Sequence, residues 1–334
     1  MSIKIVLDAM GSDDRPDPEV AAALQAADWP DIELFLVGDE GLLNEKVSQR
    51  GGSKPSLHIL HAPQALDMSD HIAEARTKKD NSMRVGMDFV KSGQADAFVT
   101  AGNTGMAMYF GTKAFGPIPG VLRPCLCGVF PVKDGRALLL DIGANAECRP
   151  EFLLQFGQMG SIYSKLMLNT SQPRVGLLAN GEEEGKGNEL VKLANPLMRD
   201  GVPGFVGNIE PKEIYAGKVD VAVTDGFTGN VFLKSSEAVA KLLLNTIKTE
   251  LLSSSRTKIG ALLSKPAFSK VRKLLDPSEI GAAPLLGLDG LVFVGHGRSD
   301  AKAMLSAIQQ AKFAVQSGLL PALRQEISIK QKEE

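Results

Sequence analysis

The feature that most constrains the fold is a repeated junction in which a short apolar run ends in a polar, glycine-rich turn. The run 219–223 leads into Asp225-Gly-Phe-Thr-Gly-Asn230. Similar turns follow earlier runs, at Asp8 to Asp13, Ala101 to Gly105 and Asp141 to Asn145. Glycines let backbone approach a ligand closely, and the N–H groups that open the next helix favour an anion. The pattern predicts an α/β enzyme that handles anions.

Apolar runs of strand length alternate with segments of helix length, which is typical of a mostly parallel sheet covered on both faces. We expect strands near residues 3–8, 32–37, 57–61, 96–100, 125–130, 136–140, 173–179, 203–207, 219–223 and 291–295. We expect helices over 18–27, 83–92, 151–168, 189–198, 230–252 and 299–316. The sequence Lys133-Asp134-Gly135 is a hairpin signal between two of the strands, so part of the sheet is expected to be antiparallel.

We expect a single catalytic domain over 1–334, with a helical hairpin at 236–281 as an extension within it. Residues 256–275 are basic and amphipathic, and Pro266 divides what would otherwise be one helix. Such a segment suits an anionic membrane or an acidic protein, and packing on a core or on a dimer mate is the alternative. The candidate contact residues are Arg256, Lys258, Leu262, Leu263, Phe268 and Lys270. The polar end, 327–334, is expected to be frayed.

The composition excludes several classes of protein. A formal net charge of -2 gives no global field that would gather nucleic acid. Cys125 and Cys127 are expected to be core residues rather than a metal pair, and no metal or redox cofactor is expected. The odd cysteine count, the absence of a signal sequence and the absence of a long apolar run predict a cytoplasmic protein. No Gly-x-Gly-x-x-Gly follows an expected strand, which argues against a standard NAD site.

Two further turns carry a cation or an imidazole. Lys186 lies between Gly185 and Gly187, as a phosphate-binding lysine on a flexible turn would, although a solvated surface lysine is the alternative. His296 lies between two glycines after the last strand, where it would bind phosphate or pass a proton unless its role is structural. Asp225 would orient a neighbour or accept a proton, whereas Asp8 is expected to organise its loop.

Four asparagines stand beside a glycine or at an expected helix start, at positions 103, 145, 188 and 230. Each alone reads as a helix cap, but together they offer uncharged donors to an oxyanion. Parallel strands would bring these turns together outside their carboxyl ends. The candidate catalytic residues are Lys186, Asn230, Asp225 and His296. The candidate phosphate- or substrate-binding residues are Asp8, Gly11, Asn103, Thr104, Gly105, Asn145, Asn188, Gly226, Thr228 and Gly229.

Six ordered motifs resemble a known family along nearly the whole chain. They are Asp8-Ala-Met-Gly-Ser-Asp13, Ala101-Gly-Asn-Thr-Gly105, Asp141-Ile-Gly-Ala-Asn145, Gly185-Lys-Gly-Asn188, Thr224-Asp-Gly-Phe-Thr-Gly-Asn230 and His296-Gly-Arg-Ser-Asp300. The chain resembles the bacterial phosphate acyltransferases of phospholipid synthesis, which convert acyl-carrier-protein thioesters and inorganic phosphate to acyl phosphate. Ser12 departs from the family pattern, which usually has a second glycine there.

The resemblance implies a Rossmann-like, three-layer α/β/α fold like that of phosphotransacetylases, with a projecting helical hairpin. It also implies a homodimer, peripheral membrane association, a downstream glycerol-phosphate acyltransferase and functional roles for Lys186 and Asn230. Phosphate held by backbone amides and Lys186 would attack the thioester carbonyl, while Asn230 stabilises the oxyanion. A coenzyme A thioester remains an alternative donor. A non-enzymic membrane scaffold that binds a phosphate metabolite is the alternative from another class.

Overall fold

The computed structural model describes residues 2–276, 278 and 281–330. Within them, eleven strands form one sheet in the order β3-β2-β1-β4-β11-β10-β5-β6-β9-β7-β8. The strands are β1 (Ile3–Asp8), β2 (Ile32–Gly38), β3 (Leu57–His61), β4 (Ala97–Thr100), β5 (Cys125–Val132), β6 (Gly135–Leu140), β7 (Val175–Leu178), β8 (Phe205–Ile209), β9 (Val221–Val223), β10 (Ala282–Leu286) and β11 (Leu291–Gly295).

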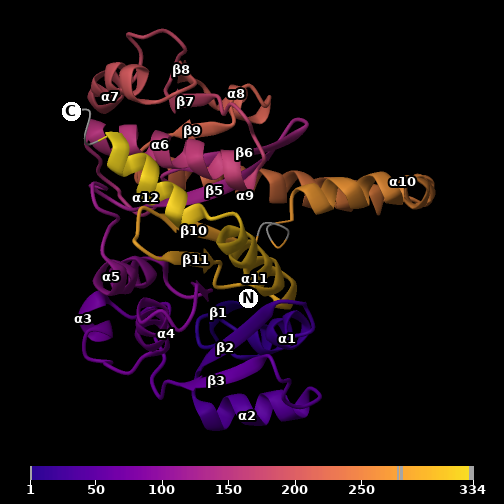
Figure 1. Ribbon diagram of the computed structural model, residues 1–334. Helices are drawn as coiled ribbons and strands as arrows, with labels where there is room; N and C mark the ends of the chain where they lie inside the picture. Colours follow the sequence, from indigo (N-terminus) through magenta and orange to yellow (C-terminus); the bar gives the residue numbers. More distant parts are fainter. Residues whose placement is uncertain (1, 277, 279–280, 331–334) are drawn as a thin grey trace.

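Helices cover both faces of this sheet, so the predicted α/β/α architecture is confirmed (Figure 1). They are α1 (Asp17–Ala26), α2 (Glu40–Gln49), α3 (Ile72–Ala75), α4 (Ser82–Lys91), α5 (Thr104–Phe115), α6 (Pro150–Met167), α7 (Glu189–Gly201), α8 (Pro211–Tyr215), α9 (Gly226–Leu251), α10 (Ser255–Leu274), α11 (Ala301–Gln316) and α12 (Leu319–Lys330). None of the helices in the described part of the chain has the length and apolar character needed to cross a bilayer.

Alternation of side chains along the central strands divides the core into two layers. In β1, Ile5 and Leu7 pack on one face of the sheet and Val6 packs on the other. In β4, Val99 and Phe98 divide in the same way. Successive side chains of a strand point to opposite faces, and apolar residues at both positions mark a strand that is buried on both sides. The apolar runs of the sequence therefore code for interior strands.

The strand directions differ from a simple parallel sheet in a way that matters for function. Strands β3, β2, β1, β4 and β11 run parallel to one another. Three antiparallel pairings follow, β11 with β10, β10 with β5 and β5 with β6. Strands β6, β9, β7 and β8 are again mutually parallel. Because three reversals separate the two parallel sets, the second set runs opposite to the first. The turns after β1, β4 and β11 therefore leave the sheet at one edge and those after β6, β7 and β9 at the other, so the condition on which the turns were expected to meet, parallel strands throughout, is not fulfilled.

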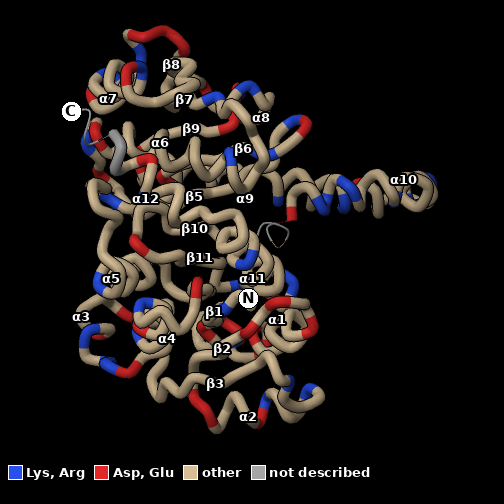
Figure 2. Tube along the Cα trace, in the orientation of Figure 1, with Lys and Arg blue, Asp and Glu red and all other residues tan. Residues whose placement is uncertain are grey.

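Helices α9 and α10 lie side by side and project from the sheet as the predicted hairpin (Figure 1). Helix α10 continues through Pro266, so the predicted break at this proline is wrong. The capping box of Ser254 and Thr257 starts α10. No described residue of α10 is buried, and lysines and arginines recur along it (Figure 2). Residues 277, 279 and 280 of the predicted extension lie outside the described residues.

Several elements are absent from the sequence-based assignment. Strand β10 was not expected, nor were α2, α3, α5, α8 and α12. The end of the chain, expected to be frayed, is helical to Lys330 with Ile327 buried, and 331–334 lie outside the described residues. Cys125 and Cys127 are both fully buried on the same face of β5, as expected of core residues.

Candidate functional site

The turns after β6 and β9 are held together around one buried carboxylate. Asp141 follows β6, and its two oxygens accept hydrogen bonds from the backbone N–H groups of residues 126, 143, 144 and 145, at 2.7 to 3.1 Å. The Asn145 side chain donates to the same carboxylate, at 2.9 Å, and to the Pro124 oxygen, at 2.8 Å. Burial raises the pKa of Asp141, and these N–H donors oppose that rise. Both residues organise the turn.

Helix α9 begins against this turn. Asp225 is its N-cap and accepts hydrogen bonds from the backbone N–H and the hydroxyl of Thr228, at 2.8 and 2.7 Å. The Gly226 N–H donates to the Asn145 oxygen at 2.8 Å. Asn230 lies inside the first turns of the helix rather than at its cap, and its amide donates to the Ile142 oxygen at 3.0 Å. The Asn230 amide is thereby fixed beside Gly143.

A second group of turns follows β1, β4 and β11. The buried Asp8 accepts a hydrogen bond from the Thr100 hydroxyl at 2.7 Å, and burial raises its pKa above the usual value. At Gly11, an added Cβ would lie 2.8 Å from the Gly102 nitrogen, so two turns touch through their main chains there. The Asp13 N–H donates to the Gly297 oxygen at 2.8 Å. These contacts unite the three turns.

Behind the β1 turn lies a second buried carboxyl group, Glu19 of α1. Its Oε1 accepts a hydrogen bond from the Ser12 N–H at 3.1 Å. Among the described residues, neither Glu19 Oε2 nor Ser12 Oγ has a hydrogen-bond partner. Burial, with a smaller contribution from nearby Asp8, raises the pKa of Glu19 to about 7. The turn after β1 is therefore hydrogen-bonded, through the Ser12 N–H, to a titratable group that the sequence analysis did not single out.

Asn103 and His296 occupy the rim of this second group. Asn103 caps α5 by accepting from the Met106 N–H at 3.1 Å, and its amide donates to the Met68 oxygen at 3.0 Å. The side chain of His296 is exposed, and its Nδ1 accepts from the Arg298 N–H at 3.5 Å. The structure thus gives Asn103 a capping role and leaves the imidazole of His296 accessible.

The Lys186 loop follows β7, the neighbour of β9, so it leaves the sheet at the same edge as the Asn230 turn. Asn188 caps α7 by accepting from the Val191 N–H at 3.0 Å. The Gly187 N–H donates to the Asn180 side chain at 2.8 Å. In the described part of the chain, the exposed ammonium of Lys186 makes no hydrogen bond or ion pair. It is therefore available to an anion.

One cavity joins turns from the two halves of the sheet. It has a volume of about 570 Å³. Thr104 and Gly105, at the start of α5, line it together with Gly143 and Ala144, from the turn after β6. Its other lining residues are Ile72, Met108, Tyr109, Thr112, Lys113 and Arg123. Sequence reasoning missed these six, although residues 104, 108 and 112 have the spacing of one helix face.

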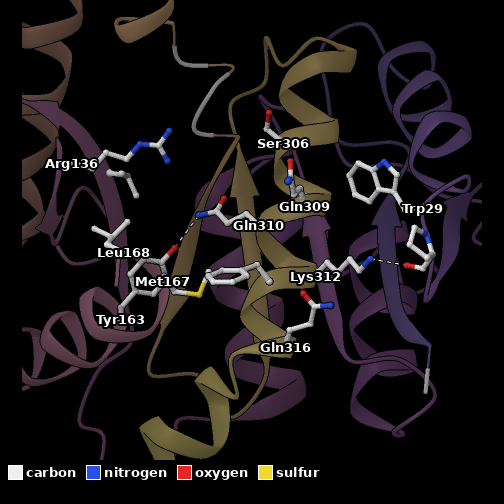
Figure 3. A pocket seen from close by; sticks show the side chains of 13 residues that line it. Trp29, Arg136, Tyr163, Met167, Leu168, Ser306, Gln309, Gln310, Lys312 and Gln316 are labelled. Atoms are coloured by element: carbon white, nitrogen blue, oxygen red, sulfur yellow. Dashed lines mark hydrogen bonds between the residues drawn. The ribbon is translucent and has the colours of Figure 1, made fainter. Parts of the chain in front are cut away.

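A second cavity, of about 680 Å³, lies between α6 and α11 (Figure 3). Trp29, Arg136 and Gln316 are among its lining residues. Across it, the Gln310 amide donates to the Tyr163 hydroxyl at 3.0 Å. None of the candidate catalytic or phosphate-binding residues lines this cavity. Of the predicted site residues, Thr104 and Gly105 line the cavity along α5, whereas the candidate catalytic residues Lys186, Asn230, Asp225 and His296 do not. The described residues contain no cluster of His, Cys, Asp and Glu suited to a metal ion.

The whole chain is similar to proteins of one family. The family described as "Fatty acid synthesis protein" matches residues 3–321. A phosphate acyltransferase of Elusimicrobium minutum is 44% identical over 328 residues, which cover 98% of this chain and 96% of the relative. A phosphate acyltransferase of Thermus thermophilus is 44% identical over 327 residues, which cover 98% and 99%.

Solved structures with the same fold are much more distant in sequence. A phosphotransacetylase from Streptococcus pyogenes has a TM-score of 0.63 and 14% identity, and the alignment covers 94% of each chain. The EutD phosphotransacetylase from Staphylococcus aureus has a TM-score of 0.59 and 15% identity, covering 95% of this chain and 94% of the other. These likenesses confirm the phosphotransacetylase-like fold that the motifs implied.

Proposed function

The chain belongs to the fatty acid synthesis protein family, in which its similar relatives are phosphate acyltransferases, and on this basis we propose that it transfers an acyl group from an acyl-carrier-protein thioester to inorganic phosphate. The observation that carries the proposal is 44% identity to a phosphate acyltransferase over 98% of the chain. The product, an acyl phosphate, would serve phospholipid synthesis through a downstream glycerol-phosphate acyltransferase. The chain is an enzyme, and we take 1–334 as one catalytic unit with 236–281 as its extension.

The geometry of the turns supports this chemistry. Lys186, together with backbone N–H groups at the helix starts, would hold phosphate, because a free ammonium and a helix N-terminus stabilise an anion. A phosphate oxygen attacks the thioester carbonyl carbon, the C–S bond then breaks, and the thiolate leaves. The Asn230 amide, fixed beside Gly143, would donate to the oxyanion of the tetrahedral intermediate. Asp225 keeps the first turn of α9 in place through Thr228.

Trapping with hydroxylamine tests the reaction. We expect the purified protein to form acyl phosphate from acyl-carrier-protein thioester only when phosphate is present. A coenzyme A thioester assayed beside it identifies the donor, since the fold alone does not distinguish the two. Absence of a phosphate-dependent product from either thioester would refute the proposed function.

A matched pair of variants tests the site. Removing the Lys186 ammonium should lower kcat/KM by roughly 100-fold or more, since a lost charge-assisted contact in the transition state costs several kcal/mol. Lys192→Ala, at another exposed lysine on α7, should leave the rate unchanged. Equal rates for Lys186→Ala and the wild type would show that Lys186 has no catalytic role.

The exposed surface of the α9–α10 hairpin is our basis for proposing a homodimer and a peripheral contact with an anionic membrane. Large apolar side chains are exposed along both helices, among them Leu242 (65%), Leu262 (71%) and Leu263 (78%). Exposed apolar area of this extent marks a surface that a partner or a lipid interface covers. Arg256, Lys258 and Lys270 are exposed on α10 and would contact lipid phosphates or the acidic carrier protein. We propose that one part of the hairpin lies in the dimer interface and that its tip contacts the membrane. Phe268, which is exposed in the single chain, would become buried in one of these two contacts. The protein would then be cytoplasmic and peripherally membrane-associated.

Co-flotation with anionic liposomes at low salt, together with sedimentation, tests this assignment. Leu262→Glu with Leu263→Glu should abolish flotation or dimerisation, because two carboxylates cannot be buried cheaply in either contact. Leu193→Glu, at an exposed leucine of α7 (53%), serves as the control and should change neither. A monomeric wild-type protein that stays off anionic liposomes would contradict both roles.

A further inference from the structure

The cavity between α6 and α11 has a lining of one charge sign. Arg136 and Lys312 are its charged side chains, and no carboxylate stands among the described residues that line it. The chain as a whole has 39 acidic and 37 basic residues, so this lining departs from the balance of the molecule. The volume of about 680 Å³ lies in the range of roughly 300 to 1,000 Å³ that small-molecule sites occupy. The cavity therefore favours an anionic ligand of small-molecule size.

The guanidinium of Arg136 is available to such a ligand. Arg136 is the second residue of β6, is exposed, and makes no hydrogen bond or ion pair within the described part of the chain. It also lines an adjoining cavity that contains two carboxylates, Asp134 and Asp220. Asp220 is bound by Arg174, whose Nε and one terminal nitrogen each lie 2.9 Å from a carboxylate oxygen, and Asp134 is exposed in the hairpin turn. A guanidinium can bind phosphate through two parallel hydrogen bonds, so Arg136 is suited to hold a phosphate group.

An aromatic ring lies across the cavity from this cation. Figure 3 shows Arg136 on one side of α11 and Trp29 on the other. The Lys312 ammonium lies 6.0 Å from the centroid of the Trp29 ring and donates a hydrogen bond to the Pro30 oxygen at 2.7 Å. These contacts hold the indole at the edge of the cavity, where its ring can stack on a planar ligand.

Unused amides on α11 lie between the arginine and the tryptophan (Figure 3). The side chains of Gln309 and Gln316 are exposed and make no hydrogen bond within residues 2–276, 278 and 281–330. Gln310 differs, because its amide donates to the Tyr163 hydroxyl at 3.0 Å. A glutamine amide both donates and accepts, as the polar edge of a nucleobase requires, whereas an alkyl chain would cover these amides without bonding to them.

We propose that this cavity binds a nucleoside phosphate. The phosphate contacts Arg136, the base stacks on Trp29, and the amides of Gln309 and Gln316 bind the polar edge of the base or the ribose. The site is separate from the proposed catalytic turns, because Arg136 begins β6 whereas Asp141 follows its end. Five residues of strand at about 3.3 Å each separate the two by roughly 16 Å. The inference therefore does not rest on the proposed function.

Fluorescence of Trp29 reports the binding directly, because it is the only tryptophan of the chain. We expect at least one of the adenosine, guanosine, cytidine and uridine 5′-monophosphates to quench it in a saturable way. The matching nucleoside and inorganic phosphate each lack one half of the ligand and should bind at least roughly tenfold more weakly. Absence of saturable quenching by all four nucleotides would overturn the proposal.

A matched pair of variants on the β5–β6 hairpin tests the phosphate contact. Arg136→Gln should raise the Kd for the nucleotide by roughly tenfold or more and leave the Kd for the nucleoside unchanged, because only a charge-assisted contact to phosphate is lost. Lys133→Gln removes an exposed lysine of the same hairpin that does not line this cavity, and its Kd should match the wild type. Melting curves establish that both variants are folded. Equal weakening by the two substitutions would show a general effect of positive charge and contradict the contact.

Two further variants test where the ligand lies. Lys186→Ala should leave nucleotide binding unchanged, and loss of binding in this variant would place the nucleotide in the proposed catalytic site instead. Phe313→Glu puts a carboxylate at a side chain that lines the cavity and is 40% exposed, so it should weaken nucleotide binding without changing the sedimentation of the protein. If it converts a dimeric wild type to a monomer, and the wild type binds no nucleotide, the cavity is part of a subunit interface and the proposal fails.

Discussion

Gly229 marks the point at which α9 meets the turn that follows β6. A Cβ added there would lie 1.9 Å from the backbone oxygen of Asp141, and main-chain atoms cannot yield as a flexible side chain does. The glycines of this motif therefore have a packing role that is separate from any ligand. Gly185, in the Lys186 loop, has nothing within 4 Å of an added Cβ and leaves room for a side chain.

Gly229→Ala should destabilise the protein by about 3 kcal/mol or more, because the overlap forces the helix and the turn apart. Gly185→Ala should change the free energy of unfolding by less than about 0.5 kcal/mol, as substitutions in open surface positions usually do. Urea unfolding of the two variants measures the difference. Comparable stability of both would contradict the close approach of α9 to Asp141.

Glu19 gives the fold a specific pH dependence. Its pKa is raised from 4.5 to about 7 in the folded protein, so the folded state binds the proton more tightly than the unfolded chain does. The stability linked to this proton is fully present below pH 4.5 and is lost as pH rises through about 7. Between these limits, the wild type should lose about 3 kcal/mol relative to Glu19→Gln, which keeps an acceptor for the Ser12 N–H. Unfolding curves at pH 4, 6 and 8 measure the difference, and parallel curves would rule out a buried, protonated Glu19.

The sequence motifs identified some of the candidate site residues, whereas other residues near the site could be found only from the fold. Lys186 and Asn230 were identified from their glycine-rich surroundings, and their roles stay predictions. Asn103 and Asn188 proved to be helix caps in the structure, a role that sequence alone does not separate from oxyanion donation. Arg123 carries no local signal, because only the tertiary fold brings its segment, α5 and the turn after β6 to one cavity.

At the scale of elements, short or glycine-containing segments escaped prediction. Helix α5 begins with Asn103 as cap and contains Gly105 and Gly111, so the sequence resembles a turn where it is helical. Strand β10 contains Pro284, a residue that argues against a strand interior. The long apolar runs of β1, β2 and β11 were located to within a residue or two, since burial on both faces leaves an unbroken signal.

The hairpin of α9 and α10 should be dispensable for folding of the sheet domain. No described residue of α10 is buried, and in α9 the buried residues are confined to Gly226 and Gly229. Replacing residues 237–273 by a short Gly-Ser link should leave the far-UV spectrum of the remainder and its cooperative unfolding intact, while the variant becomes monomeric. Loss of cooperative unfolding would show that the hairpin belongs to the core.

At the scale of the whole molecule, the sheet contains two sets of parallel strands that run in opposite directions. Residues that follow β4 in one set and β6 in the other line a common cavity. Periodicity locates strands but contains no information on their partners, so the reversal caused by β10 and the β5–β6 hairpin was out of reach of the sequence-based prediction. The overall α/β/α layering was predicted correctly because alternation of elements suffices for it.

Phosphate binding should stabilise the whole molecule. A ligand that binds only the folded state at 100 times its Kd adds about 2.7 kcal/mol, which raises Tm by a few degrees. We expect inorganic phosphate to raise the Tm of the wild type and to have a much smaller effect on Lys186→Ala, with sodium sulfate at equal ionic strength as the comparison. An identical rise in the two proteins would place the bound phosphate away from Lys186.

The junction between β10 and β5 has a mechanical consequence. Its register pairs Leu285 with Leu126 and Leu286 with Cys125, whereas β1 and β2 are paired along their full length from Ile3 to Asp8. The β10–β5 pairing is also shorter than that of β5 with β6, which runs from Cys127 to Val132, so we expect the sheet to bend more easily at this junction than at the β5–β6 pairing. Thr104 follows β4 and Gly143 follows β6, so the two residues lie on opposite sides of this junction. Such bending would set how widely the cavity that they line opens to the thioester donor.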